Sequence, residues 1–207
     1  MTRSLIAVAL VLALAPACDD DDDDIIVVDP VGDTQDEGFA RGSVLADQAA
    51  GELTGDDFLI VIGKTATILA TLNDNEIAQS DFAAPLLDDD DVFNFANVLI
   101  ADHDEANLVL DDVVRFYGIN YIPSTSANSL AAEGDAGIAL LRATDPDDID
   151  FEFSALQVIN HAEALVLLDE LALQVGPGAM GDYIADTRVM IEDHLDLASD
   201  LMGDFVF

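Results

Sequence analysis

The residues with the clearest chemical potential are three histidines, the only imidazoles in this 207-residue chain. The apolar residues around each histidine recur with the period of an amphipathic helix, and each histidine falls on the apolar stripe of a different predicted helix. A glutamate lies on the stripe of a fourth predicted helix. The sequence therefore predicts that four titratable side chains meet inside one helical core: Glu76, His103, His161 and His194.

Burial of an imidazole or a carboxylate without a partner is costly, so these four side chains should contact other polar groups. In one arrangement they bind a divalent transition metal, because one carboxylate and three imidazoles suit zinc, iron or copper. In the other, they form a hydrogen-bonded cluster with polar neighbours on the same stripes. These supporting residues are Asn107, Gln157, Asn160 and Thr187. The residues alone leave both arrangements open.

Four long amphipathic segments must position these side chains. The period of their apolar residues predicts helices over 57–86, 92–117, 150–174 and 179–202, with a shorter helical stretch over 126–142. No segment shows the alternating pattern of a strand, so the predicted fold class is all-α. Long amphipathic helices bury their stripes against one another. We therefore expect a four-helix bundle with a short crossover helix between the second and third long helices.

The N-terminus has the features of an export signal. Arg3 precedes a ten-residue apolar run over 5–14, which is too short to span a bilayer, and small residues follow at 15–17. Cys18, the only cysteine, comes next, and residues 14–18 resemble the bacterial lipobox, whose cysteine is acylated. Cleavage of an ordinary signal peptide at the same bond is the alternative. Either way, residues 1–17 are predicted to be a signal peptide.

The expected organisation after cleavage is a tether followed by one domain. Residues 18–55 begin with an unbroken acidic run and are predicted to form a lipid-anchored linker, with the helical domain over 56–207. A weak helical pattern over 39–53 is compatible with one short helix in this linker. The lipid anchor would be the contact with a membrane, on the periplasmic side of the cell envelope. Asp19 resembles an inner-membrane retention signal of some bacteria, so the inner and the outer membrane both remain candidates.

The net charge of −37, from 43 acidic and 6 basic residues, restricts the partners. A nucleic-acid backbone requires a basic surface, so nucleic acid is not an expected partner. Electrostatic attraction to anionic lipid is excluded on the same ground. The sequence does not indicate a protein partner.

Four segments also resemble a known family, in the family's own order. Residues 68–79 resemble its first helix, residues 101–107 its D-H-x-x-A-N segment, residues 157–161 its Q-V-x-x-H motif and residues 191–198 its H-L-x-x-A ending. The family is the bacterial envelope domain of unknown function 4142, whose members are often labelled outer membrane proteins. The resemblance covers about residues 65–202. It implies a ferritin-like helical bundle and an envelope location, and it implies no activity.

No motif in the sequence supports catalysis. A di-iron site needs glutamates three residues before its histidines, but Val158 and Ile191 stand in such positions. A phosphate-binding loop ending at Thr65 would need a glycine in place of Phe58. The favoured function is therefore a non-enzymatic, exported and lipid-anchored envelope module for binding or structural support. The alternative is a metal-binding or metal-storage domain that uses the Glu/His cluster.

Overall fold

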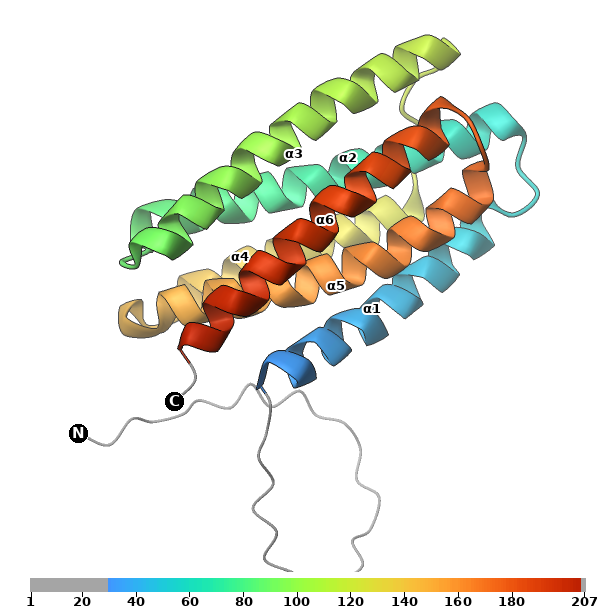
Figure 1. Cartoon of the computed structure of the whole chain (residues 1–207). Helices are drawn as coiled ribbons and strands as arrows, with labels where there is room; N and C mark the ends of the chain where they lie inside the picture. Colours follow the sequence, from blue (N-terminus) through green and yellow to red (C-terminus); the bar gives the residue numbers. More distant parts are fainter. Residues whose placement is uncertain (1–29, 206–207) are drawn as a thin grey trace, which may run out of the picture.

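The computed structural model describes residues 30–205, and it confirms the all-helical class for this part of the chain. Residues 30–205 form six α-helices, which lie roughly along one direction (Figure 1). Two short 3-10 turns, Ala84–Leu86 and Pro146–Asp148, join some of them. The helices are α1 (Pro30–Leu53), α2 (Phe58–Ala83), α3 (Asp90–Tyr117), α4 (Thr125–Ala143), α5 (Ile149–Val175) and α6 (Ala179–Asp204).

The helix ends follow from local chemistry. The side chain of Asp89 accepts hydrogen bonds from the backbone N–H groups of Asp91 and Val92, which caps the start of α3. Gly118 ends α3 in a left-handed conformation with φ 64°, which costs glycine little. The side chain of Ser124 caps α4 in the same way as Asp89 caps α3. The four long segments predicted from the sequence correspond to α2, α3, α5 and α6, and the crossover corresponds to α4.

The helices pack around a continuous apolar core. Helix α2 contacts α3 and α5, while α6 contacts α3 and α5, so these four helices enclose a shared interior. Helix α4 lies against α2, and α1 lies along α5 on the outside (Figure 1). Within residues 30–205, no helix has both the length and the apolar composition of a membrane span.

Helix α1 is the main difference from the sequence-based organisation, which assigned residues 18–55 to a tether. From Pro30 onward this segment is helical and packs closely on α5. A Cβ atom at Gly38 would lie 2.5 Å from the carbonyl oxygen of Ile159, and one at Gly42 would lie 2.5 Å from that of Glu163. These glycines allow the two helices to approach closely. They also contribute little to an apolar periodicity, which is why the sequence pattern looked weak here.

A glutamate in the last turn of α1 connects this helix to α4. The carboxylate of Glu52 accepts hydrogen bonds from the backbone N–H groups of Thr125 and Ser126, and from the hydroxyl groups of Ser124, Thr125 and Ser126. A carboxylate at a helix N-terminus also interacts favourably with the helix dipole. Burial raises the pKa of Glu52, but these hydrogen bonds outweigh burial and lower the pKa from 4.5 to about 2.

The substitution Glu52→Ala should therefore lower the free energy of unfolding by about 2 kcal/mol at pH 7. Because the folded-state pKa is depressed, the contribution of Glu52 is present above pH 4.5 and is lost as the pH falls toward about 2. Urea titrations at several pH values measure this, with Asp47→Ala on the exposed side of α1 as control. A destabilisation that stays constant down to pH 2 would contradict the assignment.

Candidate metal centre

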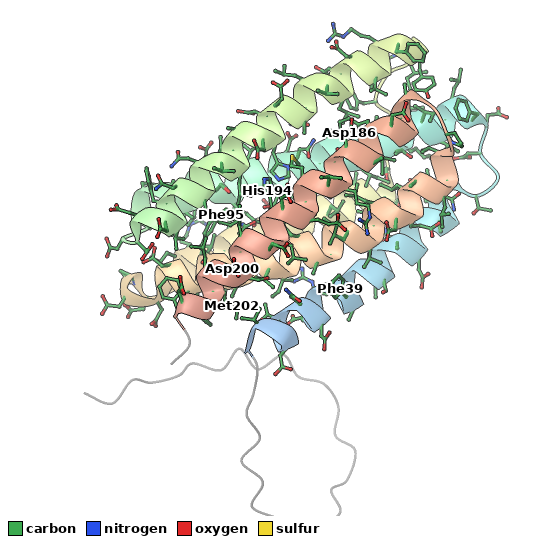
Figure 2. All side chains as sticks on the ribbon, viewed as in Figure 1. Phe39, Phe95, Asp186, His194, Asp200 and Met202 are labelled. Atoms are coloured by element: carbon green, nitrogen blue, oxygen red, sulfur yellow. The ribbon has the colours of Figure 1, made fainter. Side chains whose placement is uncertain are left out.

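The three histidines meet in the interior between α3, α5 and α6. His103, His161 and His194 are 0%, 1% and 2% exposed. Their ring centroids are 6.2 Å (His103–His161), 5.5 Å (His103–His194) and 5.3 Å (His161–His194) apart. Each ring offers one possible metal-ligand atom, and these atoms all lie within 4.8 Å of one another. In Figure 2, His194 projects from α6 near Phe95 of α3. The two rings pack edge to face, with 6.3 Å between their centroids.

Two of the imidazoles each donate a hydrogen bond from one ring nitrogen to a group that can only accept. The Nδ1 atom of His161 lies 2.8 Å from the backbone carbonyl oxygen of Gln157, one turn earlier on α5. The Nε2 atom of His194 lies 2.9 Å from a carboxylate oxygen of Asp102 on α3. Because both acceptors lack a proton, the proton belongs to His161 Nδ1 and to His194 Nε2.

The tautomer of His103 is fixed by a longer chain of hydrogen bonds. Its Nδ1 atom lies 3.0 Å from the Oδ1 atom of Asn73 on α2. Asn73 donates from Nδ2 to Asn107 Oδ1 and to the hydroxyl of Tyr183, and Asn107 donates from Nδ2 to a carboxylate oxygen of Asp74. Asp74 can only accept, which fixes the orientation of both amides. Asn73 Oδ1 is therefore an acceptor, and His103 Nδ1 carries the proton.

The second nitrogen of each ring is buried and has no hydrogen-bond partner within residues 30–205. These atoms are Nε2 of His103, Nε2 of His161 and Nδ1 of His194. In a neutral ring whose other nitrogen carries the proton, each of these three atoms would carry a lone pair. Three lone pairs that share a buried space need a donor or a cation. Metal-bound imidazoles characteristically bind with one nitrogen and donate from the other, as this arrangement allows.

The electrostatic environment keeps two of the rings neutral. Burial, and then the neighbouring imidazoles His161 and His194, hold the pKa of His103 well below its usual value of 6.5. Burial also lowers the pKa of His161 to about 3, although its hydrogen bond to Gln157 opposes this shift. Both rings are therefore neutral at neutral pH, with a proton on one nitrogen only, and the neutral imidazole is the form that binds metal.

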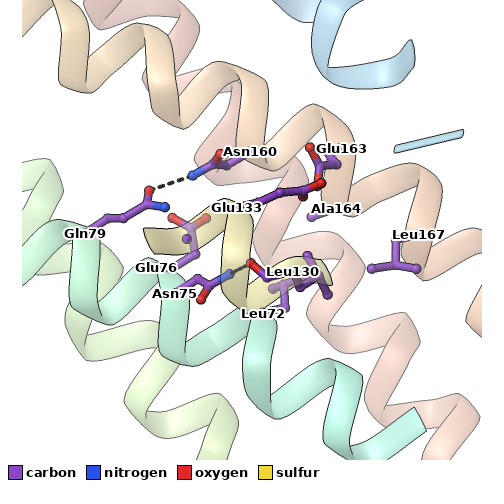
Figure 3. A pocket seen from close by; sticks show the side chains of 11 residues that line it. Leu72, Asn75, Glu76, Gln79, Leu130, Glu133, Asn160, Glu163, Ala164 and Leu167 are labelled. Atoms are coloured by element: carbon purple, nitrogen blue, oxygen red, sulfur yellow. Dashed lines mark hydrogen bonds between the residues drawn. The ribbon is translucent and has the colours of Figure 1, made fainter. Parts of the chain in front are cut away.

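Glu76 is also buried, but it does not belong to the histidine group in the described residues. It lines a separate cavity of about 20 Å³ between α2, α4 and α5, with room for about one water molecule. Figure 3 shows its carboxyl group near the side chains of Gln79, Glu133 and Asn160. One oxygen, Oε2, has no partner. Burial raises the pKa of Glu76 to about 8, and a hydrogen bond from Asn160 partly opposes this rise.

The same cavity contains a second buried glutamate. Burial raises the pKa of Glu163, the neighbouring Glu133 raises it further, and Arg41 on α1 opposes both effects. The Nε atom of Arg41 lies 3.1 Å from a carboxylate oxygen of Glu163. The cavity is thus an acidic cluster with a single guanidinium group against it.

The predicted supporting residues have different positions. Asn107 reaches His103 only through Asn73, and Gln157 contacts His161 through its backbone carbonyl rather than its side chain. Asn160 donates to Gln79 in the acidic cavity. Thr187 is buried beside Tyr183 rather than against an imidazole.

Sequence reasoning missed two residues that hold the imidazoles, Asn73 and Asp102. Asn73 had a usable signal, because it lies three residues before Glu76 on the same helix. Asp102 had none. Its side chain is 46% exposed at the edge of the stripe on α3, and it meets His194 only because α3 and α6 are neighbours.

The substitution Glu76→Gln should increase stability at neutral pH. A glutamate whose pKa is raised on folding is protonated in the folded state and ionised in the unfolded state between pH 4.5 and about 8, so wild-type stability falls as pH rises through this range. Glutamine imitates the protonated form and removes that loss. Unfolding titrations at pH 5 and pH 8 should show a gain of a few kcal/mol that is larger at pH 8. A variant that is less stable than wild type at pH 8 would contradict this interpretation.

Comparison with known proteins places the chain in a family. No curated protein and no solved structure shows a significant match. A family model described as "Domain of unknown function (DUF4142)" matches residues 44–201, which include the C-terminal part of α1 from residue 44 and all three histidines. The match covers most of the chain and agrees with the resemblance of the four sequence segments. The chain therefore belongs to the DUF4142 family of domains of unknown function.

Proposed function

We propose that this domain binds a transition-metal ion through His103, His161 and His194. The observation that carries the proposal is the arrangement of the six ring nitrogens. One nitrogen of each ring lies within hydrogen-bond distance of an acceptor, and the other is buried and has no hydrogen-bond partner among the described residues. A cation placed among these three lone pairs would satisfy all of them. The geometry thus favours the metal-binding alternative over a purely structural or partner-binding module.

The ligand type indicates which metals to expect. Imidazole nitrogen suits zinc, copper and iron, whereas magnesium and calcium prefer oxygen ligands. The hydrogen-bond partners Asn73, Gln157 and Asp102 would hold the rings in place, as partners behind metal-bound histidines commonly do. Glu76 is left out of the proposed ligand set, because its carboxyl group lines the acidic cavity.

The proposal places this domain in the cell envelope, as part of an exported lipoprotein whose four-helix interior is ferritin-like. Support for the location comes from the signal-peptide pattern and the lipobox resemblance at Cys18, which lie outside the described residues. Support for the ferritin-like arrangement comes from the packing of α2, α3, α5 and α6 around one interior. The membrane contact would be the acyl chains, on either the inner or the outer membrane.

Metal analysis tests the proposed centre. The mature chain, incubated with zinc or copper and then desalted, should retain about one ion per chain. The variant His161→Ala should lose at least tenfold in affinity, because one of three ligands is removed. The matched control is Glu76→Gln, which changes a buried polar residue of the acidic cavity and should retain the metal.

Thermal unfolding gives an independent measure of the same site. A ligand that binds only the folded state stabilises it, so a chelator should lower the melting temperature of the loaded wild type and leave that of His161→Ala unchanged. Equal metal retention in wild type and His161→Ala would rule out the histidine centre. If Glu76→Gln also loses the metal, Glu76 is a metal ligand, as the sequence analysis predicted.

The lipid anchor is tested by the mass of the mature protein from bacterial membranes. Acylation predicts an N-terminal peptide that begins at Cys18 and carries the mass of acyl chains. The variant Cys18→Ser should be released from the membrane fraction. An unmodified N-terminus at Cys18 would instead indicate an ordinary signal peptide.

A further inference from the structure

The histidine centre provides few ligands for a divalent metal. Among the described residues, the group of close ligand atoms contains three imidazoles and no carboxylate or thiolate. Divalent zinc and cobalt in proteins take at least four ligands, and sites with three protein ligands complete their coordination with a molecule from solution. A divalent ion bound to His103, His161 and His194 would therefore have one position left.

The charge around the site indicates what kind of molecule would fill that position. Neutral imidazoles cancel none of the two positive charges of the ion. The one carboxylate that is hydrogen-bonded to a ligand ring is Asp102, which contacts His194 at 2.9 Å. The ion and Asp102 together leave one uncompensated positive charge among side chains that are 0–2% exposed. An uncompensated buried charge is costly, and a monovalent anion at the fourth position would cancel it.

We propose that a divalent metal in this centre keeps one exchangeable coordination position, and that this position binds a small monovalent anion. The inference rests on the proposed metal site and adds a ligand class to it. Hydroxide, azide and carboxylates of similar size have the required chemistry. The side chain of Asp102 is 46% exposed, while that of His194 is 2% exposed.

Cobalt(II) and azide test this inference on the full mature chain. Cobalt(II) replaces zinc in histidine sites, and its visible absorption depends on the number and type of its ligands. Metal analysis first establishes that cobalt is bound. Azide is then added at a fixed ionic strength set with a weakly coordinating anion, so that general screening of the chain's large negative charge stays constant. The expected result is a saturable change of the cobalt spectrum.

The variant Asp102→Asn tests the charge argument separately. Asparagine still offers an oxygen to the Nε2–H group of His194 but lacks the negative charge, so the metal unit becomes more positive. Azide should bind this variant roughly three- to tenfold more tightly than it binds wild type. The matched control is Asp104→Asn, an exposed neighbour on α3, which should leave azide affinity unchanged.

Each outcome has one interpretation. Cobalt that is bound but does not respond to azide overturns the open position, while the metal site itself stands. A response to azide that is equal in wild type and Asp102→Asn overturns the charge-balance argument. Cobalt that fails to bind removes the proposed function, and metal analysis reveals this before any azide is added. If Asp102→Asn loses cobalt, a titration of wild type with formate, a second monovalent anion, still tests the open position.

Discussion

A buried imidazole has two nitrogens that must both be satisfied, and this requirement organises the interior between α3, α5 and α6. The fold satisfies one nitrogen of each ring with an acceptor supplied by its own helix or by a neighbouring one. The remaining nitrogen of each ring is buried close to the other two and has no hydrogen-bond partner in the described part of the chain. Such an arrangement costs free energy unless a hydrogen-bond donor or a cation is present. The same hydrogen bonds that fix the tautomers therefore also prepare the three lone pairs for binding.

Helix α5 separates this centre from the acidic cavity. Asn160 and His161 are adjacent in sequence, so their side chains leave the helix about 100° apart. Asn160 therefore contacts Gln79 in the acidic cavity, while His161 joins the other imidazoles. The two clusters have opposite requirements. The acidic cavity holds carboxyl groups whose pKa values are raised by burial, whereas the centre holds imidazoles whose pKa values are lowered by it.

The sequence was sufficient for the features that depend on periodicity. The apolar stripes predict five of the six helices, and they place three histidines on inward faces, where the structure finds them. Of helix α1, only a weak helical pattern over 39–53 was visible, because glycines at the contact with α5 interrupt the apolar stripe. The position of Glu76 could not be predicted. Periodicity specifies which face of a helix is buried, but the cavity a side chain enters also depends on the rotation of neighbouring helices and on the long, flexible glutamate itself.

Because α1 packs closely on α5, the segment that could tether the domain to a membrane is shorter than the sequence analysis predicted. Because α1 begins at Pro30, only eleven residues separate Cys18 from the first helix, instead of the 37 that a tether ending at residue 55 would supply. A fully extended chain of this length spans about 40 Å at most. In the lipid-anchored form proposed above, the helices would therefore be confined to a thin layer next to the bilayer. The strong negative charge of the chain would then oppose contact with anionic headgroups. Electrostatic repulsion would therefore keep the helical domain close to the bilayer surface but not in contact with it.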